Sequence, residues 1–151
     1  MRSDTTIYFK YGSMNSGKSL ELIKVAHNYK ENDIHSLVLK PSIDTRRPGK
    51  VFSRVGLELD AYELDSEDVE AVKNIMQKEL GNYKVILVEE CNFLSPAVID
   101  AIVDFAYDNG ISSVMFFGLK VDFRGNLFTG TTRAIERADK IEEATSICWC
   151  G

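Results

Sequence analysis

Residues 12 to 19 carry the pattern most directly tied to chemistry in this chain. They read Gly-Ser-Met-Asn-Ser-Gly-Lys-Ser, with two glycines separated by four residues and followed by Lys and Ser, which is the pattern of a phosphate-binding loop. Gly12 and Gly17 allow the tight turn that faces consecutive N–H groups to phosphates. Lys18 is placed to reach the outer phosphates, and the Ser19 hydroxyl is placed to take part in a magnesium site. The chain is therefore predicted to bind a nucleoside triphosphate.

The residues around this loop have the order that it needs. A short β-prone run at 7–11 precedes it. After it, apolar residues recur at the spacing of one helical face: Leu22, Ile23, Ala26 and Tyr29. The helix N-terminus adds its positive end to the N–H groups of the loop. A chance glycine turn is the alternative, and this context argues against it.

A second group of chemically active residues follows a wholly apolar run. Residues 85–88 read Val-Ile-Leu-Val, and Glu89 and Glu90 come directly after them. Ligands of open α/β sheets bind at the carboxyl ends of the strands, so these carboxylates are expected beside the phosphate-binding loop. One can hold the magnesium shell, and the other can orient or deprotonate the attacking group in phosphoryl transfer. An acidic pair after an arbitrary strand is otherwise a solvated turn.

A third segment opens onto the same edge of the expected sheet. Residues 118–128 read Gly-Leu-Lys-Val-Asp-Phe-Arg-Gly-Asn-Leu-Phe and follow the apolar run 114–117. Phe123 and Phe128 beside Arg124 suit a flat, polar ligand such as a nucleobase with a phosphate. Taken alone, the two rings are more typical of packing residues, and the arginine is more typical of a surface position.

Together, segments 12–19, 89–94 and 118–128 resemble the type II thymidine kinase family. The resemblance extends to Ser53-Arg54-Val55-Gly56 and to residues 138–151, and so covers nearly the whole chain. It implies transfer of the γ-phosphate of ATP to the 5'-hydroxyl of thymidine, which gives thymidine monophosphate for nucleotide salvage and DNA synthesis. It also implies a homo-tetramer.

The resemblance implies a role for each matching residue. Glu90 would be the catalytic general base, and Ser19 and Glu89 would associate with Mg2+. The residues implied to bind ATP are Gly12, Ser13, Met14, Asn15, Ser16, Gly17, Lys18, Ser19, Glu89, Cys91 and Asn92. Those implied to bind the nucleoside are Arg54, Phe123, Arg124 and Phe128. Two positions depart from the family pattern, with Glu89 where Asp is usual and Asn92 where Gln is more usual. By residue type, Cys91 is expected to be a small packing residue.

The alternation of β-prone and helical segments predicts the fold. The β-prone runs are 7–11, 37–39, 85–88 and 114–117, and helical patterns lie between them. Two of the helices are expected to start at the caps Ser66 and Ser95 and to end at Gly81 and Gly110. We therefore expect an α/β fold of the P-loop NTPase type, with a mostly parallel sheet and helices on both faces. Residues 41–57 break the pattern and are expected to form a mobile basic loop or a small hairpin.

The family resemblance implies that the end of the chain is the start of a zinc-ribbon segment. We expect a kinase core at 1–140 and, at 141–151, the first half of the zinc ribbon and lid that the family resemblance implies. Cys148 and Cys150 would be two of the four ligands of a tetrahedral site, and two thiolates alone do not close a structural zinc site. Zn2+ is therefore expected only if the chain continues with a second ligand pair.

Composition limits the class of protein. The 151 residues are 44% hydrophobic and 27% charged, which is ordinary for one globular domain. Eighteen basic and 23 acidic residues give a formal charge of −5 without a basic block, so a nucleic-acid surface is disfavoured. The start lacks an apolar signal region, and no apolar run reaches the about 18 residues of a membrane helix. We expect a cytoplasmic protein whose partner is a small molecule, with no nucleic acid and no membrane.

Two other functions stay open from the sequence. One is a non-catalytic ATP-binding remnant of the family, which would bind ATP without thymidine-dependent release of ADP. The other is a P-loop ATPase that acts on nucleic acid, since an acidic pair after a strand would serve there too. The acidic charge and the short chain argue against the second alternative.

Overall fold

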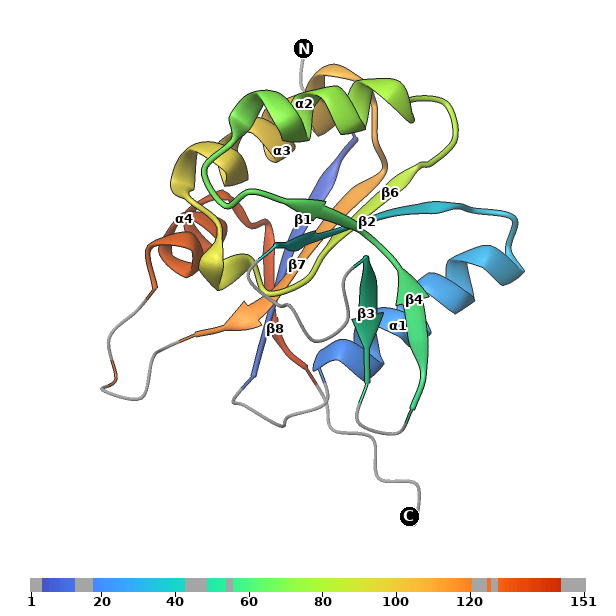
Figure 1. Ribbon diagram of the computed structural model, residues 1–151, viewed down its shortest axis with the longest axis horizontal. Helices are drawn as coiled ribbons and strands as arrows, with labels where there is room; N and C mark the ends of the chain where they lie inside the picture. Colours follow the sequence, from blue (N-terminus) through green and yellow to red (C-terminus); the bar gives the residue numbers. More distant parts are fainter. Residues whose placement is uncertain are drawn as a thin grey trace.

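The centre of the fold is a parallel sheet (Figure 1). The computed structural model describes residues 4–12, 18–42, 49–53, 56–120, 125 and 128–144. The strands are β1 (Thr6–Gly12), β2 (Ser36–Pro41), β3 (Lys50–Phe52), β4 (Glu58–Asp60), β5 (Tyr62–Leu64), β6 (Val85–Val88), β7 (Ser113–Leu119) and β8 (Lys140–Glu143). The helices are α1 (Lys18–Glu31), α2 (Val69–Lys78), α3 (Pro96–Asp108) and α4 (Thr129–Arg137), with a 3-10 turn η1 (Cys91–Phe93). Among these residues, six strands form one sheet in the order β5-β2-β6-β7-β1-β8, and each neighbouring pair is parallel.

Helices cover both faces of this sheet, because side chains alternate between the two sides along each strand. Ile86 and Val88 of β6 lie in one apolar cluster with residues of α2, α3 and α4, whereas Val85 and Leu87 lie in a second cluster with residues of α1. Figure 1 shows α2 and α3 on one side of the sheet and α1 on the other. Burial on both faces explains why β6 is apolar throughout. The predicted α/β fold is confirmed.

The N-terminal caps of α2 and α3 can be compared with those predicted from the sequence. Ser95 caps α3 and Pro96 is in its first turn, as the sequence predicts. At α2 the cap is Asp68, whose carboxylate accepts the Ala71 N–H at 3.0 Å. The predicted cap Ser66 is therefore wrong. Asp68 directly precedes the helix, and its negative charge also interacts favourably with the positive end of the helix dipole.

Both of these helices are followed by the predicted glycine. Gly81 has φ of +98° and Gly110 has φ of +67°, which is the left-handed region that favours glycine over other residues. The last helical residues are Lys78 and Asp108. The chain therefore leaves each helix within a few residues of the position that the sequence predicts.

Strand β3 of the predicted irregular segment 41–57 forms a hairpin with β4, which lies just beyond that segment. β3 pairs antiparallel with β4 in a separate two-stranded sheet. Val51 of β3 is fully buried in the cluster that contains α1. The ammonium of Lys40, which is buried at the end of β2, donates to the Lys50 carbonyl at 2.7 Å. The hairpin is thus anchored both to α1 and to the carboxyl end of β2.

The sheet continues almost to the last described residue. β8 pairs in parallel with β1, and its residues are exposed at the edge of the sheet. The expected boundary after residue 140 falls within this strand, so residues 141–143 continue the core sheet. Residues 145–151 lie outside the described residues, and the zinc-ribbon segment stays a prediction. None of the helices in the described ranges has the length and apolar character needed to cross a membrane.

Candidate active site

The two ends of the predicted phosphate-binding loop meet at the carboxyl edge of the sheet. β1 ends at Gly12, which is in register with Leu119 at the end of β7. α1 begins at Lys18, so its first turn carries Lys18 and Ser19. Residues 13–17 of the loop lie outside the described residues. A strand therefore precedes the loop and a helix follows it, in the predicted order. The loop leads into the N-terminus of α1, and helix N-termini are favourable sites for anions.

The acidic pair after β6 meets the first turn of α1. The Ser19 hydroxyl donates to a carboxylate oxygen of Glu89. Glu89 is 7% exposed, and its backbone N–H donates to the Leu39 carbonyl of β2 at 2.8 Å. The carboxylate is thus held between α1 and the strand next to β6. The contact joins the two predicted motifs, as their common place at the carboxyl edge leads us to expect.

Lys18 lies in the electric field of both acidic residues. Burial lowers the pKa of its ammonium, while the negative charges of Glu90 and Glu89 act in the opposite direction, and burial prevails. A bound anion such as a phosphate would add to the carboxylates and favour the charged ammonium. A cation, a hydroxyl and two carboxylates together form a set of groups suited to phosphoryl transfer.

Glu90 has a backbone conformation that is uncommon for residues other than glycine. Its φ is 51° and its ψ is 45°, and Asp33 is the other non-glycine residue with positive φ in the described part of the chain. Such a conformation persists only where the surrounding structure holds it, and it is frequent at functional sites. Glu90 ends the extended chain after β6, and its carbonyl accepts the Phe93 N–H at 3.1 Å to form the turn η1.

Two further residues of this motif have buried side chains. Cys91 is fully buried, and burial raises the pKa of its thiol, so the thiol is neutral and packs in the core. Asn92 is 4% exposed, and its amide oxygen accepts the Leu119 N–H at 3.1 Å. The resemblance implied that both residues bind ATP. With the side chains buried in this way, we expect any contact with ATP to come from their main chain.

Phe93, an exposed aromatic residue close to the candidate site, was not among the predicted site residues. Phe128, implied to bind the nucleoside, packs edge-to-face on Phe93 with ring centroids 5.8 Å apart. Phe93 is 40% exposed, which is uncommon for so large an apolar side chain. Its position three residues after Glu90 was the available signal. The other predicted site residues, Arg54, Phe123, Arg124, Cys148 and Cys150, lie outside the described residues.

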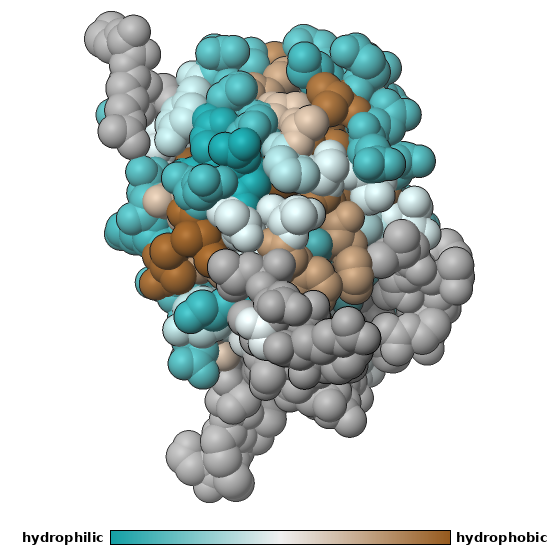
Figure 2. All heavy atoms as spheres, turned by 90° about the vertical axis from the view of Figure 1, so that its left-hand side faces the viewer, coloured by the Kyte–Doolittle hydropathy of each residue, from teal (hydrophilic) through white to brown (hydrophobic). Residues whose placement is uncertain are grey.

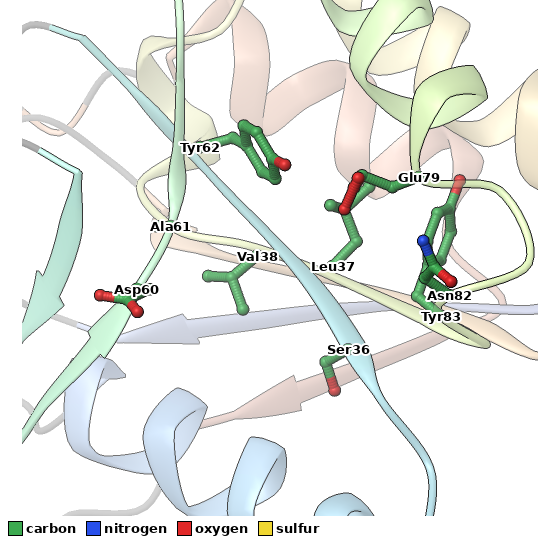
Figure 3. Close-up of a pocket in the computed structure, with 9 residues that line it drawn as sticks. All are labelled: Ser36, Leu37, Val38, Asp60, Ala61, Tyr62, Glu79, Asn82 and Tyr83. Carbon is green, nitrogen blue, oxygen red and sulfur yellow. The ribbon is translucent and has the colours of Figure 1, made fainter.

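A cavity of about 290 Å³ lies apart from these residues, beside the first half of β2. Figure 3 shows Ser36, Leu37 and Val38 of β2 along one side of it, with Tyr62, Glu79, Asn82 and Tyr83 around it. None of the predicted site residues lines this cavity. We therefore place the candidate active site at the carboxyl edge of the sheet, where the two motifs meet.

Comparison with known proteins identifies the family of this chain. The family model described as thymidine kinase matches residues 5–151. The thymidine kinase of Enterococcus faecalis is 41% identical over 148 residues, which cover 95% of this chain and 73% of the relative. That of Lactococcus lactis is 43% identical over 146 residues, with 95% and 75% covered.

A solved structure of low sequence identity shares the fold. It is the genome packaging NTPase of Sulfolobus turreted icosahedral virus 2 in complex with ATP-gammaS, with a TM-score of 0.54 and 15% identity. The match covers 97% of this chain and 78% of the viral protein. At this identity the likeness concerns the fold alone, whereas the family model and the bacterial relatives match nearly the whole sequence. The chain belongs to the thymidine kinase family.

Proposed function

We propose that this chain transfers the γ-phosphate of ATP to the 5'-hydroxyl of thymidine at the carboxyl edge of its sheet. The observation that carries the proposal is the contact of the Ser19 hydroxyl with the Glu89 carboxylate, beside Lys18. This contact brings the phosphate-binding loop and the acidic motif into one site. Membership of the thymidine kinase family supports ATP and thymidine as the two substrates.

Ser19 and Glu89 have the chemistry to hold Mg2+. Hydroxyl and carboxylate oxygens are ligands that this hard cation takes in proteins, and the two side chains are already in contact. When bound, the ion would offset negative charge on the transferred phosphoryl group. Glu89 in place of the usual Asp keeps the charge and lengthens the reach to the metal.

Glu90 and Lys18 act on the reacting atoms. The Glu90 carboxylate accepts the proton of the 5'-hydroxyl as the 5'-oxygen forms its bond to the γ-phosphorus. The bond between this phosphorus and the bridging oxygen breaks, and ADP leaves. Lys18 neutralises charge on the phosphates, a form of electrostatic stabilisation that is most effective where burial excludes water.

The nucleoside is proposed to bind next to the turn that follows Glu90. Phe128 and Phe93 offer aromatic surface there, and a flat base packs well on aromatic rings. The implied contacts of Arg54, Phe123 and Arg124 are part of the same proposal. We further propose that the protein is a cytoplasmic homo-tetramer that acts on a nucleoside rather than on nucleic acid, and that zinc at Cys148 and Cys150 requires a second ligand pair.

The test is thymidine-dependent formation of ADP and thymidine monophosphate by the purified protein. We expect both products in equal amounts, and neither from the Lys18→Ala variant. ATP binding without product would identify a non-catalytic remnant. ADP release that is stimulated by DNA or RNA, and not by thymidine, would identify an ATPase that acts on nucleic acid.

A further inference from the structure

We propose that Asn92 is a positioning residue, which holds the turn that carries Glu90 against the ends of β7 and α4. The proposal rests on the role of Glu90 as the base and goes beyond it by naming what fixes the base in place. The family resemblance implied a contact between Asn92 and ATP, whereas the burial and the hydrogen bond of its amide assign it an internal role.

A line of hydrogen bonds connects the turn to both elements. The Asn92 amide oxygen accepts the Leu119 N–H at 3.1 Å, at the last residue of β7. The Leu119 carbonyl in turn accepts the hydroxyl of Thr131, in the first turn of α4, at 2.5 Å. Asn92 and Thr131 are both buried, so solvent competes little for these bonds. Asn92, two residues after Glu90, is therefore tied to β7 and, through Leu119, to α4.

Two glycines bring β7 and α4 close to this turn. A Cβ atom at Gly118 would lie 2.9 Å from the Asn92 amide oxygen and 2.9 Å from the Cys91 sulfur. One at Gly130 would lie 2.3 Å from the Cys91 carbonyl oxygen. These distances leave no room for a side chain, so the backbones of both elements pack directly on the turn. The residues that directly follow Glu90 are confined in this way, and a left-handed backbone persists only where the surrounding structure holds it.

α4 is itself held firmly at its other end. The Arg137 guanidinium binds Asp100 and Asp104 of α3, with both N–O distances 2.7 Å. Figure 2 shows the side of the molecule at the left of Figure 1, where α4 lies, and hydrophilic side chains cover much of it. The helix that packs on the turn and bonds Leu119 is therefore also tied to α3.

The amide nitrogen of Asn92 helps to distinguish a positioning role from a simple packing role. Its nitrogen is buried and has no hydrogen-bond partner among the described residues. A buried donor without a partner costs stability, so packing alone would favour an apolar side chain of the same size. The bond that the amide oxygen makes to Leu119 is what the amide contributes.

Loss of this bond is expected to slow the reaction with little effect on ATP binding, because Lys18 and Ser19 belong to α1 and the main-chain groups of the turn are kept. Displacing a catalytic group by about 1 Å costs up to about 100-fold in rate. Asn92→Leu keeps the side-chain volume and removes the amide oxygen. We expect it to lower kcat about 10- to 100-fold and to change the KM for ATP by less than about twofold.

Two matched variants separate positioning from stability. Asn92→Gln keeps an amide oxygen and is expected to retain more of kcat than Asn92→Leu. Thr5→Val removes a buried hydroxyl that donates to the Ile111 carbonyl at 2.5 Å, at the opposite end of the sheet. We expect Thr5→Val to lower the melting temperature and to leave kcat unchanged.

The deciding measurement is a double-mutant cycle of kcat with Glu90→Gln. If Asn92 acts through Glu90, Asn92→Leu lowers kcat in the wild-type protein and has little further effect in the Glu90→Gln variant. Equal fold losses in the two backgrounds, or a wild-type kcat for Asn92→Leu, would overturn the proposal. A wild-type kcat for Glu90→Gln would instead overturn the assignment of the base, and the positioning role with it.

A second variant covers the case in which Asn92→Leu does not fold. Thr131→Val removes the hydroxyl that donates to the Leu119 carbonyl and keeps the side-chain volume. A lower kcat with an unchanged KM for ATP supports the proposal, and an unchanged kcat overturns it.

Discussion

At the scale of single residues, the site depends on charges that are partly withdrawn from water. Burial lowers the pKa of Lys18, and Glu90 and Glu89 oppose that shift. The sequence pointed to these residues as candidates and placed both motifs at the same edge of a parallel sheet, where the structure shows Ser19 and Glu89 in contact. It did not predict the positive φ of Glu90, because the packing of Gly118 and Gly130 on the residues that follow Glu90 joins segments that are distant in the sequence.

Lys18→Ala is expected to abolish thymidine-dependent activity and to leave the fold intact. The substitution removes a cation from the place where negative charge develops, while the half-buried stem of Lys18 contributes little to the core. Steady-state kinetics and thermal melts of the two proteins provide the measurement. Comparable turnover in both, with matching melts, would contradict the role given to the phosphate-binding loop.

Glu90→Gln and Glu89→Gln are expected to have different effects. The first keeps the shape but cannot accept the hydroxyl proton, so kcat falls by about 10²- to 10⁴-fold while ATP binding persists. The second weakens a metal ligand and raises the Mg2+ concentration that half-maximal activity requires. Activity measured across a magnesium titration tests both. The reverse pattern would mean that the two roles have to be exchanged.

At the scale of elements, the sequence predicted β1, β2, β6 and β7. The clearest signals were the apolar runs 85–88 in β6 and 114–117 in β7, which are buried on both faces. β8, Lys-Ile-Glu-Glu, carries no such signal, because it is an exposed edge strand whose extended form comes from pairing with β1. β5 has three residues and pairs only with the end of β2 in the described structure. Tertiary pairing rather than local sequence therefore decides these two strands.

The hairpin β3–β4 provides a prediction at this scale. Lys40→Met keeps the buried stem but leaves the Lys50 carbonyl without the donor that now lies 2.7 Å away. We expect the free energy of unfolding to fall by about 1 to 3 kcal/mol, with faster hydrogen exchange in β3. Urea denaturation and amide exchange measure the two effects.

The control for this substitution is Lys50→Met. It removes the exposed ion pair with Asp60 across the hairpin, which is expected to matter much less. Equal unfolding free energies for Lys40→Met and the wild-type protein would show that the buried ammonium does not anchor the hairpin.

At the scale of the whole molecule, the chain spans 73% and 75% of the lengths of the Enterococcus and Lactococcus relatives. The conserved fold accounts for the phosphate site. Cys148 and Cys150 supply two thiolates, half of the ligands of a tetrahedral zinc site. A second ligand pair and a cover over the nucleoside are what the family resemblance implies beyond these residues, and both stay predictions.

A chimeric protein tests whether a further segment is needed for zinc binding and full activity. Joining the residues that follow the matched region of the Enterococcus relative after Gly151 is expected to bring in about one zinc per chain and to raise thymidine kinase activity, because a closing segment excludes water from the site. ATP affinity is expected to change little, since the phosphate contacts lie between Gly12 and Ser19. Metal analysis and phosphorylation assays on both proteins decide it. Equal activity without zinc in either would show that the shorter chain is self-sufficient.

The left-handed backbone of Glu90 has a consequence for how this position evolves. Glycine adopts φ of +51° without the steric cost that a side chain incurs, so Glu90→Gly is expected to melt at or above the temperature of the wild-type protein while losing kcat. A lower melting temperature would contradict this. A substitution to glycine at this position would stabilise the fold, so selection for catalytic turnover is needed to keep a carboxylate there. The residue type at this position therefore indicates whether a related protein is still selected for the reaction. A glycine at the position of Glu90 would indicate a related protein in which this selection has ended.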